Sequence, residues 1–339
     1  MSLICDLQRR EYHHIPNDLY EVINTLKEKS IEECYEYFGK GNKTTIKSYI
    51  KFIVDNDLGF VDTQIIPELV PINLQWDTYS PITNLIIELD ENSDFNTDFF
   101  LELLKLNIDA VEIRSYNAIS EELLNSVLNI FQSTTIYNIK IALKFSNWMN
   151  KKTLSKICQD NMTISTFIVH SSPKENIYKI MKDSTVLFFS ETNLDSERCC
   201  GNIHPKYFIT NVELFTESQE HNTCLNRKLA IDVNGNIKNC PSMQENFGNI
   251  KTASLKQVLE NSDLKKYWFI NKDKISVCQD CEFRHVCTDC RAYIENPEDL
   301  YSKPLKCGYD PYANVWEDWT INPLKQSTIA YYNLENLIA

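Results

Sequence analysis

Cys224-Leu-Asn-Arg-Lys-Leu-Ala-Ile-Asp-Val-Asn-Gly-Asn-Ile-Lys-Asn-Cys240 opens the stretch that decides how the last third of this 339-residue chain folds. Five more cysteines follow as two pairs and a single residue: Cys278-Gln-Asp-Cys281, Cys287-Thr-Asp-Cys290 and Cys307. Two residues between paired cysteines let one tight turn direct both sulfurs at the same metal. The stretch therefore predicts a metal-binding domain.

The segment between Cys224 and Cys240 predicts a β-hairpin. Two short strand-like runs, residues 229–233 and 237–240, flank Asn234-Gly235. Asn-Gly between two such runs is typical of a primed two-residue turn. The hairpin would place Cys224 at its entrance and Cys240 at its exit.

Residues 224–319 resemble the SPASM domain, an iron-sulfur module usually appended to radical SAM enzymes that modify ribosomally made peptides. The likeness includes the cysteine pattern, Cys-Pro-Ser after the hairpin, Phe247-Gly-Asn-Ile250 and a helix-like segment at 255–267. The resemblance implies two 4Fe-4S clusters. It assigns Cys278, Cys281, Cys287 and Cys307 to one cluster, and Cys224, Cys240 and Cys290 to the other. The common form separates its last pair by three residues, whereas two residues separate Cys287 from Cys290, which leaves the geometry at Cys290 open.

Seven thiolates are one fewer than two such clusters need. The eighth ligand could be Cys199, Cys200, His221, a substrate thiol or solvent. Zinc is the alternative metal, because closed four-thiolate zinc sites use the same cysteine pairs. A disulfide framework is disfavoured by the odd number of cysteines in the motif.

Composition limits the partners of this chain. Its formal net charge of -13 would repel phosphate backbones, so we expect no nucleic-acid binding. We expect no membrane span, since no run approaches about eighteen apolar residues. The N-terminus lacks the features of a signal peptide, and we expect a cytoplasmic protein whose cysteines stay reduced.

Residues 1–72 predict a winged helix-turn-helix module. Strand-like runs at 2–7 and 11–15 precede three helical patterns at 18–26, 31–38 and 44–54, and Phe60-Val61 would begin a return strand. The residues at 7–17 and 57–61 resemble the RiPP recognition element, a module that binds the leader of a precursor peptide. Such a module adds an extended peptide to an exposed sheet edge. The alternative is a structural cap that binds nothing.

Residues 73–215 predict a parallel sheet covered by helices, either a partial barrel or an open layer. Strand patterns and helix patterns alternate; the strands are expected at 83–90, 110–115, 139–145, 165–170 and 185–189, and the helices at 97–107, 120–131, 151–158 and 173–181. Function would gather at the carboxyl ends of the strands. The polar candidates there are Glu88, Asp90, Glu112, Arg114, Lys144 and His170.

A cysteine motif is absent from this middle segment. A radical SAM core needs Cys-x3-Cys-x2-Cys after its first strand, and residues 85–105 contain no cysteine. We therefore expect no S-adenosylmethionine chemistry of the usual kind.

Nearly end to end, from Ile4-Cys-Asp-Leu-Gln-Arg9 to Cys307-Gly-Tyr-Asp-Pro311, the chain resembles the peptide maturase of "grasp-with-spasm" systems. The expected fold is a winged-helix module (1–72), a degenerate radical-SAM-like βα domain (73–215) and a SPASM domain with two clusters (216–339). The resemblance implies a precursor peptide and an ATP-grasp ligase as partners, and it indicates no reaction. A cluster-based peptide-modifying enzyme and a zinc-stabilised scaffold are the alternatives.

Overall fold

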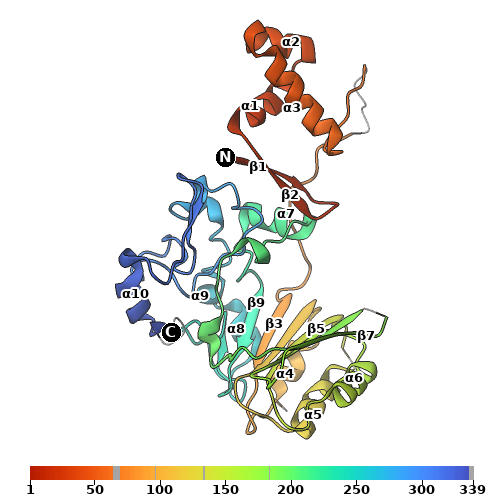
Figure 1. Ribbon diagram of the computed structural model, residues 1–339. Coiled ribbons are helices and arrows are strands. Elements are labelled where there is room, and N and C mark those ends of the chain that lie inside the picture. Colours follow the sequence, from red (N-terminus) through yellow and green to blue (C-terminus); the bar gives the residue numbers. More distant parts are fainter. Residues whose placement is uncertain (64–68, 96, 133, 183, 336–339) are drawn as a thin grey trace.

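The structure is a computed structural model that describes residues 1–63, 69–95, 97–132, 134–182 and 184–335. Three parts follow one another in space: an N-terminal helical module at one end, a sheet-based part at the other, and a cysteine-rich part that contacts both (Figure 1). Among the described residues, no helix has the length and apolar character needed to cross a membrane.

The N-terminal module consists of a two-stranded antiparallel sheet followed by three helices. Its elements are β1 (Ser2–Asp6), β2 (Glu11–Ile15), α1 (Asn17–Leu26), α2 (Ile31–Tyr37) and α3 (Lys43–Asp55). Ser30 begins α2 through a reciprocal capping box with Glu33, as the Ser-x-x-Glu spacing predicts. Val22, Cys34 and Ile46 form the small core between the helices.

The return strand predicted at Phe60-Val61 is absent. The chain there has no regular structure, and Phe60 and Val61 are 63% and 58% exposed. Two apolar residues of high strand propensity form a strand only when another strand pairs with them. The structure therefore supports a hairpin followed by three helices, and the winged form of this module is not confirmed.

One large, mostly parallel sheet organises the rest of the chain, as predicted. Its strands are β3 (Asn84–Glu88), β4 (Ala110–Ser115), β5 (Asn138–Lys144), β6 (Ile164–His170), β7 (Asn176–Ile180), β8 (Thr185–Phe189), β9 (Lys228–Ile231) and β10 (Ile237–Lys238). The order is β10-β9-β3-β4-β5-β6-β8-β7, with antiparallel pairs only at the two edges. β9 pairs in parallel with β3, so the sheet includes residues on both sides of position 215.

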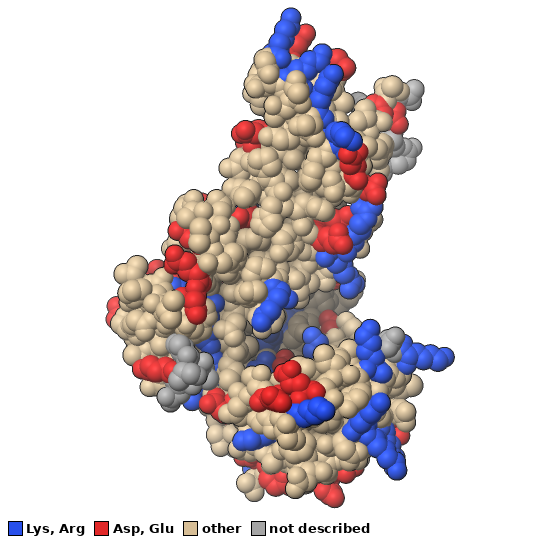
Figure 2. All heavy atoms as spheres, in the orientation of Figure 1, with Lys and Arg blue, Asp and Glu red and all other residues tan. Residues whose placement is uncertain are grey.

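Side chains alternate between the two faces of this sheet. In β4, Val111, Ile113 and Ser115 are buried, while Glu112 and Arg114 are half-buried. The buried face packs against α4 (Asp98–Leu103), α5 (Glu121–Phe131) and α6 (Lys151–Asp160), which cover one side of the sheet (Figure 1). Figure 2 shows a hollow between the sheet and the rest of the molecule, with charged side chains around it.

The helix predicted at 173–181 is instead the edge strand β7. Tyr178 and Ile180 pack on the core while Ile177 and Lys179 alternate outward, which is the period of a strand. Met181 and Lys182 both have positive φ and turn the chain directly into β8. A short apolar run is ambiguous between helix and strand, and the neighbouring strand decides it here.

The C-terminal part contains little regular structure. It holds α7 (Val212–Glu220), α8 (Leu255–Glu260), α9 (Ser262–Lys265), β11 (Tyr309–Asp310), β12 (Val315–Trp316) and α10 (Gln326–Tyr331). The buried apolar residues of α8 and α9 join the large core of the sheet, while others form three small clusters, each of which includes cysteines. Small apolar clusters contribute little stabilisation, so a metal bound by these cysteines would stabilise the region further.

The predicted hairpin at 229–240 is present, and its turn differs from the prediction. Gly235 has φ of +78, whereas Asn234 does not have the positive φ that a type I′ turn needs. The Asp232 carboxylate accepts hydrogen bonds from the amides of Asn234 and Asn236, both at 2.9 Å. This side-chain acceptor stabilises a longer turn than the Asn-Gly pair alone predicts.

Candidate metal centres

Four cysteines that the sequence assigns to one cluster line a single cavity. Cys278, Cys281, Cys287 and Cys307 reach it from separate turns. The pair at 278–281 lies on a 3₁₀ turn closed by a 3.0 Å hydrogen bond from the Cys281 amide to the Cys278 carbonyl. Val277 before it has φ of +67, an unfavourable conformation for a β-branched residue. Backbone strain of this kind persists where the surrounding structure fixes a functional side chain.

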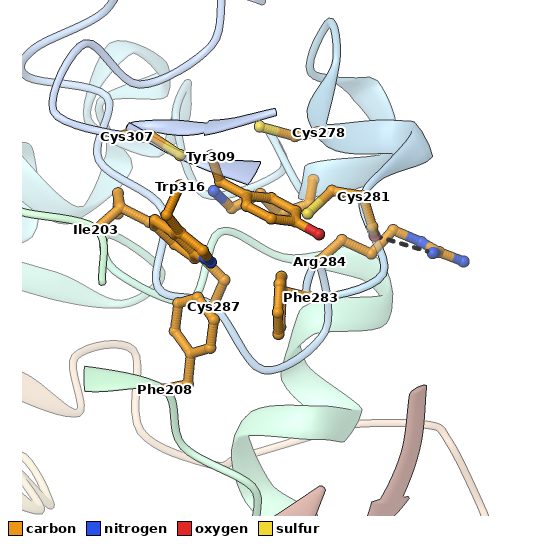
Figure 3. A pocket seen from close by; sticks show the side chains of 11 residues that line it. Ile203, Phe208, Cys278, Cys281, Phe283, Arg284, Cys287, Cys307, Tyr309 and Trp316 are labelled. Atoms are coloured by element: carbon orange, nitrogen blue, oxygen red, sulfur yellow. Dashed lines mark hydrogen bonds between the residues drawn. The ribbon is translucent and has the colours of Figure 1, made fainter. Parts of the chain in front are cut away.

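Aromatic rings form the wall of this first cavity. Phe208, Phe283, Tyr309 and Trp316 gather beside the cysteines (Figure 3). Ring centroids are 5.0 Å apart for Phe208–Phe283, 5.1 Å for Phe283–Tyr309 and 4.8 Å for Tyr309–Trp316. Rings in this number keep water away from whatever the four sulfurs hold, and hydrophobic surroundings are one of the factors that set the potential of a metal site.

A buried cation lies beside the first group of thiols. Lys272 is only 5% exposed, and its Nζ atom is 3.3 Å from a carboxylate oxygen of Asp289. Burial alone lowers the pKa of Lys272, but the thiolates of Cys287 and Cys278, with Asp289, outweigh burial and raise it. The ammonium group therefore stays charged and compensates negative charge on the cysteines.

Asp289 and Asn222 connect this region to the hairpin entrance. Asp289, which precedes Cys290, accepts hydrogen bonds from Arg291 Nη2 at 2.8 Å and from Asn222 Nδ2 at 2.6 Å. Asn222 in turn accepts a 3.0 Å hydrogen bond from the amide of Cys224. A buried polar network of this kind fixes the backbone around both groups of cysteines.

The second group consists of Cys224, Cys240 and Cys290. Cys240 and Cys290 are buried, and Cys224 accepts a 3.8 Å hydrogen bond from Lys228 Nζ. Burial raises the pKa of Cys290, and the thiolate of Cys224 adds to the shift. Cys240 belongs to a buried cluster against which Cys224 packs, and the charges of both contribute to the raised pKa of Cys290.

Burial raises the pKa of thiols in both groups. Burial raises the pKa of Cys281 to about 12, and burial followed by the charges of neighbouring cysteines raises that of Cys240 to about 12. A metal would have to displace these protons, because the thiolate is the ligand. All twelve cysteines are free thiols in this structure.

The donor set consists of cysteine thiols, which are the ligands of iron-sulfur clusters and also of closed zinc sites. Within the described ranges, no three His, Cys, Asp or Glu side chains are arranged to hold one metal ion. When bound, such clusters supply electron transfer and charge at the positions of these thiols.

The eighth-ligand candidates lie in different places. His221 stands between the rings of Trp76 and Phe269, at 5.3 and 5.4 Å, and lines another cavity with Arg227. Burial lowers the pKa of His221. Cys199 ends a short 3₁₀ turn, Glu197–Cys199 (η2), and Cys200 follows it.

The polar residues at the strand ends differ in what their side chains contact. His170 is buried and bonds the carbonyl of Ser115 at 2.9 Å, so its role is structural. Glu112 pairs with Arg114 at 2.7 Å, on the face toward the hollow. Glu88 is buried, and the structure gives its Oε1 atom no hydrogen-bond partner.

Two other candidates at the strand ends have simpler roles. Asp90 accepts a hydrogen bond from the amide of Asn92 at 2.9 Å and so shapes the turn after β3. Lys144 is half-buried at the end of β5. The six candidates therefore do not form one catalytic group.

Sequence reasoning missed several charged residues of the site. Lys272, Asp289 and Arg291 are buried charged residues in a cysteine-rich segment. Their charge, in a segment that the cysteines mark as a metal site, is the only sequence signal that could have identified them. Tyr116 was also missed; burial, followed by the charge of Glu88, raises its pKa.

Comparison with protein families identifies a SPASM iron-sulfur cluster-binding domain at residues 223–282. The matched segment contains Cys224, Cys240, Cys278 and Cys281, and it ends before the remaining three predicted ligands. A search of curated proteins finds no match to this chain.

Proposed function

We propose that this chain is a component of a ribosomal-peptide maturation system, in which the N-terminal module binds a precursor peptide beside the iron-sulfur domain. The observation that carries the proposal is a direct contact between these two parts. Tyr12 and His14 of β2 both pack against Phe283, with ring centroids 5.9 and 5.2 Å away. Phe283 also lines the first cysteine cavity. A peptide bound at the hairpin would therefore lie next to the cluster domain.

The hairpin has the physical features of a peptide-binding edge. Within the part of the chain that the structure describes, its two strands pair only with each other, so an added strand could pair with their outer edges. α3 lies along the hairpin, with the ring of Phe52 at 6.4 Å from His13. Val54 at the end of α3 is 41% exposed, and Phe60 and Val61 follow it on the surface. These apolar side chains would accept the side chains of a peptide.

The cluster domain in this proposal carries two 4Fe-4S clusters. Cys278, Cys281, Cys287 and Cys307 would hold the first, and Cys224, Cys240 and Cys290 would contribute to the second. The shared cavity, the grouped thiols and the buried Lys272 support this assignment. In this proposal, residues 1–72 bind the peptide, residues 73–215 form the radical-SAM-like part, and residues 216–339 carry the clusters.

The partner in the proposed system is an ATP-grasp ligase in the cytoplasm. The sequence has no Cys-x3-Cys-x2-Cys motif, so the chain itself would not cleave S-adenosylmethionine by the usual route. The end-to-end resemblance to grasp-with-spasm maturases supports a shared precursor peptide. In this arrangement the chain presents the peptide, and the ligase carries out the ATP-dependent step.

Peptide titration tests the proposal directly. Purified, cluster-loaded chain would be titrated with fluorescent leader segments of precursor peptides encoded beside its gene. Val54→Glu should weaken binding about tenfold, because it places charge among the apolar contacts. Leu324→Glu, at a position 90% exposed in the C-terminal part, is the matched control and should bind as the parent does. Failure of all these peptides to bind the parent chain would contradict the proposal.

A further inference from the structure

A loop from the middle of the chain lies against the second group of cysteines. It contains η2, then Cys200 in an extended conformation (φ −82, ψ 170), then Gly201 with φ of +87. This loop lies between β8 and α7, far in sequence from Cys290. The loop carries the two adjacent cysteines, Cys199 and Cys200.

Three separate contacts hold this loop on the cysteine-rich part. Ser242, two residues after Cys240, donates a 3.1 Å hydrogen bond to the carbonyl of Glu197. The buried Lys306 donates to the carbonyl of Cys200 at 2.8 Å and also to that of Arg198. Lys306 precedes Cys307 of the first group, and Ser242 follows Cys240 of the second. Residues next to predicted ligands of both groups therefore hold the backbone of the loop.

A further contact brings the loop onto the sulfur of Cys290. A Cβ atom added to Gly201 would lie 2.8 Å from the Sγ atom of Cys290, closer than van der Waals contact permits. The backbone immediately after Cys200 therefore touches a predicted ligand. Only glycine tolerates both this approach and the positive φ.

The two adjacent cysteines differ in what their sulfurs meet. The Sγ atom of Cys199 lies 3.8 Å from a carboxylate oxygen of Asp195, to which it donates. Cys200 instead lies next to the second group, because the glycine after it contacts the sulfur of Cys290 and Lys306 holds its carbonyl.

We infer that Cys200 is the fourth protein ligand of the second cluster, which gives each cluster four cysteines. The inference rests on cluster binding by the C-terminal part and is independent of peptide binding at the N-terminus. Iron would replace the thiol proton of Cys200, which passes to solvent. No iron of the second cluster would then be open to a substrate, so the cluster would act through electron transfer or structure and not as a Lewis acid.

Paired substitutions in the full chain test this assignment. Parent, Cys200→Ala and Cys199→Ala proteins would be reconstituted without oxygen, and their iron, acid-labile sulfide and electron paramagnetic resonance spectra compared. A 4Fe-4S cluster with three cysteines readily loses its unligated iron when briefly oxidised by ferricyanide. Cys200→Ala should therefore show a three-iron signal after this treatment, whereas the parent and Cys199→Ala should not.

Equal spectra for Cys200→Ala and the parent would overturn the inference, as would a three-iron signal in the parent or in Cys199→Ala alone. Alkylation of the parent chain keeps the test decisive if Cys200→Ala does not fold. Iodoacetamide followed by peptide fragmentation should modify Cys199 and spare Cys200 until iron is chelated. Modification of Cys200 as fast as Cys199 in the loaded protein would contradict the assignment. Failure of peptides to bind would contradict only the proposed function.

Discussion

The ring of Tyr12 in the N-terminal hairpin stands edge-on to the ring of Phe283, with centroids 5.9 Å apart and planes at 82°. Phe283 lies between Cys281 and Cys287, so this one ring belongs both to the cavity wall and to the hairpin contact. Edge-to-face pairs of this kind add about 0.5–1.5 kcal/mol beyond the area they bury. The position of the hairpin and the shape of the first cavity are therefore linked.

Phe283→Ala should loosen the hairpin and destabilise the protein. Phe283 is 3% exposed, and truncating a buried phenylalanine costs about 3–5 kcal/mol in free energy of unfolding. Amide hydrogen exchange of residues 2–15 should become faster, while the helices on the sheet keep their protection. Phe60→Ala, at an exposed position, should change stability by less than about 0.5 kcal/mol. Unchanged exchange at the hairpin would show that the contact does not hold it.

Cys287→Ala should remove the first cluster and leave the second. The iron and sulfide contents of the reconstituted protein should both fall by about half, since one of two clusters is lost. Cys158→Ala is the matched control, because Cys158 is equally buried but packs in the core under the sheet. A loss of iron in the control, or full iron in Cys287→Ala, would contradict the ligand assignment.

Lys272→Met should lower the reduction potential of one cluster. Reduction adds negative charge, and the buried ammonium beside Cys278 and Cys287 stabilises that charge. Lys272→Arg keeps the charge and should leave the potential closer to that of the parent. Potentiometric titration followed by electron paramagnetic resonance measures the difference. An unchanged potential in Lys272→Met would mean that the cluster does not lie beside this residue.

The buried Glu88 should make stability depend on pH. Burial raises the pKa of Glu88 from 4.5 to about 7 in the folded protein. A raised carboxyl pKa gives stability that is present below about pH 4.5 and is lost as the pH rises through about 7. Glu88→Gln should therefore be more stable than the parent at about pH 8, by about 2 kcal/mol, and show little gain near pH 5.

Urea unfolding at both pH values measures this difference, with the exposed Glu298→Gln as control. The control should unfold as the parent does at both pH values, because its carboxyl is in solvent. A gain for Glu88→Gln that is equal at the two pH values would show that the effect comes from packing and not from the charge of Glu88.

Regular alternation of buried and half-buried residues along the strands made much of the sheet predictable. β4 and β8 have the bounds that the sequence predicts, because buried and half-buried residues alternate strictly along them. The pairing of β9 with β3 was not predictable, since it joins two strands that are far apart in the chain. The same is true of β7, whose strand form depends on its pairing with β8.

The candidate site could be predicted where the spacing of the cysteines in the sequence indicates a shared metal. The spacing of Cys278 and Cys281 indicates two members of the first group, the resemblance adds Cys287 and Cys307, and the structure brings all four to one cavity. Cys200 could not be chosen over Cys199, because adjacent residues have the same sequence signal and only their three-dimensional neighbours distinguish them. The ion pair of Lys272 with Asp289 is a tertiary contact of the same kind.

Metal analysis of anaerobically purified chain tests the central claim most directly. Iron, acid-labile sulfide and zinc would be measured per chain, together with the electron paramagnetic resonance spectrum of the reduced protein. The account predicts about eight irons and about eight sulfides, as two 4Fe-4S clusters require, with little zinc. One or two zinc ions with no sulfide would contradict it and make the cysteine-rich part a structural zinc domain.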